Sequence, residues 1–118
     1  MNRLFATVAI VLLLIIVVLS VVPPDYRATT PLPHKVEHGL IFALTGLAFG
    51  FGFTTQLAVQ VFGLIAFSVV VEVAQLAVPG RHARLSDFVV DALSASIGAA
   101  AAVAVRRYTE RGREASRP

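Results

Sequence analysis

The residues best suited to chemistry form a block of acidic and amide side chains, set in segments that are otherwise strongly apolar. Glu72 and Gln75 come near the end of one such segment, and Asp87 and Asp91 near the start of the next. An ionised side chain at the centre of a bilayer costs about 2.5–3.5 kcal/mol on insertion scales, so such residues usually face a bundle interior and mark a site. The search for function therefore begins with this block.

The spacing of these side chains predicts that each helix presents its polar residues on one face. Lys35 and His38 are three residues apart, as are Glu72 and Gln75, and residues three or four apart share a helix face. In the last apolar segment one stripe is predicted, which consists of Asp87, Asp91, Ser94 and Gly98. Arg81 and Arg84 lie in the short loop between the two acidic segments, so we expect them to lie over the same polar layer.

Such a layer could bind a charged headgroup or exchange protons. We expect Lys35, Arg81 and Arg84 to neutralise a phosphate or carboxylate. The same ligand-binding set would include Gln75, Asp87 and Asp91. Glu72 and His38 are the candidate catalytic residues, because either could orient a ligand or act as a general base.

A purely structural interpretation stays open beside this one. Glu72 could pair with Lys35 or Arg81, and Asp91 could accept a hydrogen bond from Ser94 or Gln75. Polar contacts between membrane helices are common and contribute about 0.6 kcal/mol on average. Such a contact requires one or two polar residues, whereas this layer collects more, and their number favours a site.

A metal site is the weaker hypothesis. His34 and His38 have i, i+4 spacing and could ligate a metal together with an acid, but His34 directly follows Pro33 and could lie outside the helix. We therefore expect no metal and no cofactor.

The composition indicates a membrane protein. Of 118 residues, 57% are hydrophobic and only 14% are charged, which is too apolar for a water-soluble globule of this size. Because the chain has no cysteine, thiol catalysis and disulfides are excluded. Half of the ten basic residues lie in one terminal tail, at Arg106, Arg107, Arg111, Arg113 and Arg117. This placement fits membrane orientation better than nucleic-acid binding, so we expect lipids and not nucleic acid as partners.

Four segments are apolar and long enough to cross a membrane, which predicts an all-α polytopic protein. They cover about residues 4–22, 36–53, 57–78 and 87–105, followed by a basic tail over 106–118. At about 1.5 Å per residue, such segments cover roughly the 30 Å hydrocarbon thickness. The first apolar run is longer than the roughly 7 to 15 residues of the apolar region of a signal peptide, so we expect it to be a membrane span.

Local signals predict where these helices begin and end. Pro23-Pro24 should stop the first helix and lead into a helix-averse loop over 25–33. Pro79-Gly80 should end the third helix, with the glycine in left-handed geometry. Ser86 is a predicted N-cap for the fourth helix, and the tail from Tyr108 is expected to be frayed and solvated.

Charge predicts the orientation. Four spans place both termini on one side, where Arg3 and the five tail arginines oppose Arg27, Lys35, Arg81 and Arg84 in the two loops of the other side. The excess of basic residues on the side of the termini favours a cytoplasmic location for both termini. This orientation puts the polar layer at the outer face. A proton or ion pathway is less favoured, because the inner halves of the four spans contain no acid.

The arrangement resembles the VanZ-like family of small bacterial membrane proteins, named after a protein accessory to teicoplanin resistance. The resemblance covers about residues 32–100 and is carried by Lys35-Val-Glu-His38, by the block from Glu72 to Arg81, and by Asp87 with Gly98. Where the family usually has asparagine and then glycine, this chain has Asp91 and Ser94. The resemblance implies a four-helix integral membrane protein of the bacterial inner membrane, but no established reaction.

Two functions follow as hypotheses. The first is a cell-envelope protein whose outer-facing polar cleft binds an anionic lipid or a lipid-linked glycan headgroup, with or without catalysis by Glu72 or His38. The second is a non-catalytic accessory subunit that stabilises a larger membrane complex. In that case the small-residue faces around Gly46 and Gly50 would contact other integral membrane subunits.

Overall fold

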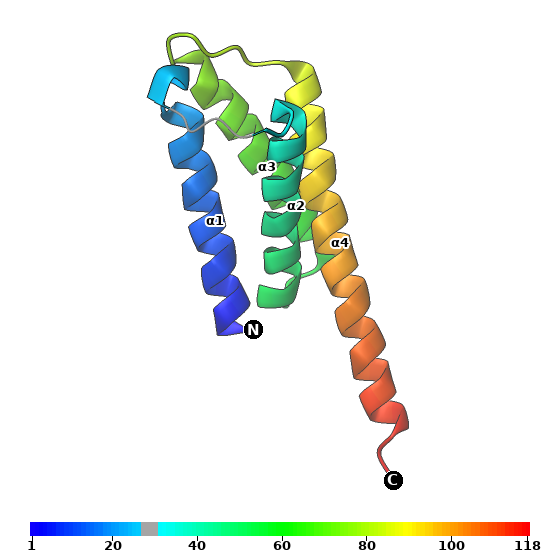
Figure 1. Ribbon diagram of the computed structural model, residues 1–118. Helices are drawn as coiled ribbons and strands as arrows, with labels where there is room; N and C mark the ends of the chain where they lie inside the picture. The colour runs from blue at the N-terminus through cyan, green and yellow to red at the C-terminus, as the bar shows by residue number, and fades with distance from the viewer. Residues whose placement is uncertain (27–30) are drawn as a thin grey trace.

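The computed structural model describes residues 1–26 and 31–118, and its described part is all-α (Figure 1). The long helices are α1 (Arg3–Val21), α2 (His34–Gly52), α3 (Leu57–Leu76) and α4 (Leu85–Ala115), and a short 3-10 helix, η1, covers Pro24–Tyr26. Arg27, which the orientation argument counts among the outer-loop cations, lies outside the described residues.

The four long helices form an antiparallel bundle. α2 packs most extensively against α4 and lies between α4 and α1, while α3 contacts α4 and α1 and completes the ring. The N-terminus and the C-terminal part of α4 point to the same end of the bundle, and the η1 region and the α3–α4 loop lie at the other (Figure 1). The molecule measures 62 × 24 × 23 Å, because α4 continues well past its neighbours (Figure 1).

Small residues allow α2 and α4 to approach closely. A Cβ on Gly46 would overlap the backbone carbonyl of Ala95, and one on Gly98 would overlap the carbonyl of Ala43. In a membrane no hydrophobic force drives helices together. They associate through close packing instead, and small residues let their backbones approach. Gly46 and Gly50 therefore pack against α4 inside the bundle.

The distribution of polarity is inverted relative to a soluble protein. Phe62, Leu93 and Ile97 are exposed, whereas Glu72 and Asp91 are buried. α1, α3 and α4 are each long and apolar enough to cross a membrane. Together these features indicate an integral membrane protein, since an apolar exterior is stable only when lipid covers it.

α2 differs from the other long helices. It has 19 residues, but its first two turns carry polar side chains, and it is not among the helices that are apolar enough along their length to cross a membrane. These side chains are His34, Lys35, Glu37 and His38.

Several predicted boundaries agree with the structure. α1 ends at Val21, directly before Pro23-Pro24, and the third helix ends before Pro79. Gly80 has φ 78°, the left-handed conformation that glycine adopts without steric cost.

Other boundary predictions are wrong. Arg84, not Ser86, is the N-cap of α4, with extended backbone at φ −123° and ψ 135°. η1 places one helical turn in the loop predicted to avoid helix. The tail is exposed but helical to Ala115, because its arginines and glutamates are good helix formers that extend an already nucleated helix.

Candidate functional site

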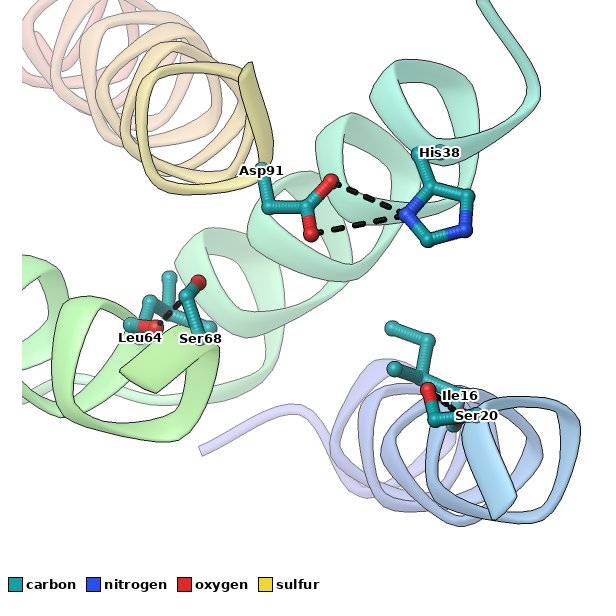
Figure 2. Close-up of polar contacts among 6 residues, drawn as sticks. All are labelled: Ile16, Ser20, His38, Leu64, Ser68 and Asp91. Carbon is teal, nitrogen blue, oxygen red and sulfur yellow. Dashed lines mark hydrogen bonds and ion pairs between the residues drawn. The ribbon is translucent and has the colours of Figure 1, made fainter. Parts of the chain in front are cut away.

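The centre of the polar layer is an ion pair between α2 and α4. His38 Nδ1 lies 3.3 Å from Asp91 Oδ1 and 3.5 Å from Oδ2. Asp91 projects from α4 towards the imidazole, whose other nitrogen points away from it (Figure 2). A carboxylate only accepts hydrogen bonds, so in a hydrogen bond between the two groups the Nδ1–H donates to Asp91.

This pair replaces the partners predicted for Asp91. Its side chain is completely buried and contacts His38, where Ser94 or Gln75 was expected. The reason is geometric, since Asp91 and His38 face each other across the α2–α4 contact.

Glu72 lies in the same layer without a hydrogen-bonding partner. It is 8% exposed, and both carboxylate oxygens are buried and make no hydrogen bond. Asp91, Asp87 and His38 act on it electrostatically, and the backbone of Arg84 is nearby but outside hydrogen-bond geometry. Leaving a buried charged group unpaired is costly, so Glu72 is the least satisfied side chain of the layer.

Beside Glu72 a shallow groove opens on the outer surface of α3 and α4. Its volume is about 370 Å³, and Glu72 and Arg84 are its charged lining residues. The rest of the lining is apolar and consists of Val69, Val73, Ala83, Leu85 and Phe88. Val69, Val73 and Leu85 are largely exposed, so the groove is open on the side that lipid would cover.

Two predicted cations are not part of the buried layer. Arg81 donates to the backbone carbonyls of Leu19 and Val22, at 2.8 and 2.7 Å, where it caps the end of α1, whose terminal carbonyls carry partial negative charge. Lys35 is exposed although His38, one turn away, is buried. The predicted helix face therefore runs from an exposed Lys35 to a buried His38.

The remaining predicted residues are buried as expected of one layer. Gln75 and Asp87 are 4% and 8% exposed. Asp87 also lies in the first turn of α4, where a negative charge is favoured by the helix dipole. Ser94 Oγ faces Gly39 of α2.

Sequence reasoning missed several buried polar residues with a structural role. Ser20 and Ser68 donate to the carbonyls of Ile16 and Leu64 in their own helices (Figure 2), which satisfies a hydroxyl inside an apolar helix. Gln60 donates to the carbonyls of Phe53 and Thr55 and so fixes the α2–α3 turn. In the sequence, the sign of such a role is a single serine or glutamine within an apolar run.

The imidazole rings of His34 and His38 lie side by side and are tilted by 48° to each other. The ring centroids of His34 and His38 are 4.2 Å apart. Within residues 1–26 and 31–118, no group of three or more potential ligands is placed to hold a metal ion.

Comparison of the chain with protein-family models, with curated proteins and with solved structures found no match. The function proposed for the chain therefore depends on the geometry of the polar layer.

Proposed function

We propose that the chain is a four-span, VanZ-like integral membrane protein of the bacterial cell envelope, with both termini in the cytoplasm. In this orientation the layer formed by His38, Glu72 and Asp91 faces the outside of the inner membrane. There it binds the headgroup of a lipid or of a lipid-linked glycan. Binding does not require a reaction.

The observation that carries this proposal is the state of Glu72. A carboxylate with two unpartnered buried oxygens destabilises the free protein, and it is expected to persist where it has a binding role. Glu72 is four residues before the end of α3, about 6 Å along the helix axis. That depth matches the boundary between acyl chains and headgroups.

The predicted anionic character of the ligand depends on fewer cations than the sequence suggests. Arg81 is engaged with α1 and Lys35 is exposed away from His38. Arg84 stands at the groove beside Glu72. In the proposal it is this guanidinium that contacts a phosphate, since arginine suits phosphate geometry.

The test is whether lipid bound to the purified protein depends on the layer. We expect wild-type protein, solubilised gently and washed, to retain phospholipid that is detected by phosphate analysis. Glu72→Gln and His38→Ala should lose most of it, while the exposed controls Glu110→Gln and His82→Ala should not. Full retention by both layer variants would contradict the proposal.

The alternative is a non-catalytic accessory subunit that stabilises a larger membrane complex. The glycine faces assigned to subunit contact are occupied by α4. Stoichiometric protein partners that remain bound to wild-type protein after gentle solubilisation would favour that alternative.

A further inference from the structure

The groove beside Glu72 combines one buried anion, one exposed cation and an apolar wall. Glu72 forms the acidic part, Arg84 lies at the rim, and the wall comes from Val69, Val73 and Phe88. A ligand complementary to all three parts has a positive group, a negative group and a hydrocarbon chain.

The charge of the layer decides which end of the ligand meets Glu72. Asp91 and Asp87 act on Glu72 together with the single imidazole of His38, so this cluster, Glu72 included, carries three carboxyls against one histidine. A phosphate placed there would be repelled, whereas an ammonium group would be attracted. Its N–H groups would also supply the hydrogen bonds that the Glu72 oxygens lack.

Arg84 supplies the complementary contact. It is exposed at the N-cap of α4, where both the guanidinium and the first N–H groups of the helix favour an anion. A phosphate at this rim and an ammonium over Glu72 would be adjacent, as they are in a zwitterionic phospholipid headgroup.

We infer that the groove binds a phospholipid whose headgroup carries a primary ammonium, with this ammonium on Glu72, the phosphate on Arg84 and an acyl chain along Val69, Val73 and Phe88. The inference rests on the proposed function and specifies its ligand. The Glu72 oxygens are covered in the free protein, so binding requires its carboxyl to turn towards the groove, a change of side-chain rotamer.

The experiment is a competition among lipids with identical acyl chains and different headgroups. Full-length protein in detergent is mixed with equimolar phosphatidylethanolamine, phosphatidylcholine and phosphatidylglycerol, and bound lipid is measured by native mass spectrometry. Ethanolamine has N–H donors, choline has none, and glycerol has no positive charge. We expect ethanolamine lipid to exceed choline lipid about tenfold, as one charge-assisted hydrogen bond would give.

Two variants separate the contacts. Glu72→Gln should bring the ethanolamine and choline lipids to equal binding without weakening the glycerol lipid. Arg84→Gln should weaken all three alike, since each carries the phosphate. Glu110→Gln, an exposed acid of the same helix as Arg84, is the matched control and should keep the wild-type preference. Circular dichroism melting shows which variants are folded.

The outcomes distinguish the inference from the proposed function. Equal binding of ethanolamine and choline lipids to the wild type would overturn the inference and leave headgroup binding in place. So would a preference that persists in folded Glu72→Gln. Binding that ignores the headgroup in every variant would overturn both. Equally tight binding of free phosphoethanolamine would exclude the role of the apolar wall.

Discussion

At the scale of single residues, two acids at the centre of the layer are buried in different ways. Asp91 is fully buried against His38, and Glu72 is buried without a hydrogen bond. The two acids thus differ in kind. Asp91 has a partner and joins α2 to α4, whereas Glu72 contributes nothing to packing that an apolar residue could not, which makes it the better candidate for function.

The His38–Asp91 pair predicts strong coupling between two substitutions. Removing one member of a buried ion pair costs about 3–5 kcal/mol, because the other charge is left unpaired. His38→Ala and Asp91→Ala should each destabilise the protein strongly, and the double variant should recover part of the loss. We expect a coupling energy above about 1.7 kcal/mol, the largest value typical of neutral polar pairs in membranes.

The free energies of this double-mutant cycle are measured by reversible unfolding in mixed micelles, followed by circular dichroism. The exposed His82→Ala provides the reference for loss of a histidine. A coupling energy at or below about 1.7 kcal/mol would show that the contact is an ordinary polar one.

At the scale of helices, the packing of α2 on α4 fixes the site. Gly46 and Gly98 bring the two backbones together, and the same contact brings His38 opposite Asp91. Arg106, further along α4, donates to the carbonyls of Gly50 and Phe53 at 2.9 and 2.7 Å. It caps the end of α2 and sets the position of one helix along the other.

Glycine substitutions test the close approach. Gly46→Ala should destabilise the protein by about 1–3 kcal/mol, because the added methyl group overlaps the Ala95 carbonyl and separates the helices. Gly63→Ala is the matched control on α3, where nothing lies within 4 Å of an added Cβ. It should leave stability unchanged or raise it by up to about 1 kcal/mol. Equal effects of the two substitutions on the unfolding free energy would contradict close packing at Gly46.

Truncation of α4 tests the role of Arg106. Ending the chain after Arg107 removes exposed helix and should change the unfolding free energy by less than about 0.5 kcal/mol. Ending it after Val105 also removes the two hydrogen bonds of Arg106 and should cost about 1.5–3 kcal/mol more. If both truncations melt alike, Arg106 does not fix the end of α2.

At the scale of the whole molecule, all four long helices expose apolar side chains. The buried acids belong to the end of α3 and the start of α4, and these helix ends lie opposite the N- and C-termini (Figure 1). The proposed topology follows from this arrangement together with the arginine-rich tail. It requires that α2, despite its polar first turns, crosses the membrane with the others.

Single cysteines test this topology directly, because the natural chain has none. His82→Cys should react with a membrane-impermeant maleimide in intact cells with a permeabilised outer membrane. Thr55→Cys and Ser116→Cys should react only after the inner membrane is opened. Labelling of Thr55→Cys from outside would exclude four spans, and labelling of Ser116→Cys from outside would reverse the orientation.

The sequence by itself determined the all-α class, the approximate extent of the apolar helices and the residues of the polar layer. These follow from local properties: apolar runs of sufficient length, prolines that stop α1 and α3, and the cost of acids such as Glu72 and Asp91 in lipid. Gly80 is a similar case, since its left-handed backbone follows from its position after a helix and a proline.

Only the tertiary structure decided which of these residues meet. Equal spacing along a helix does not say which face is covered, so Lys35 is exposed and His38 buried although both lie on α2. Nor does it say that Arg81 reaches the carbonyls of α1, a contact between residues about sixty positions apart. Asp91 has a partner because the close approach of α2 and α4 brings His38 opposite it, whereas Glu72 lies on α3 and makes no hydrogen bond.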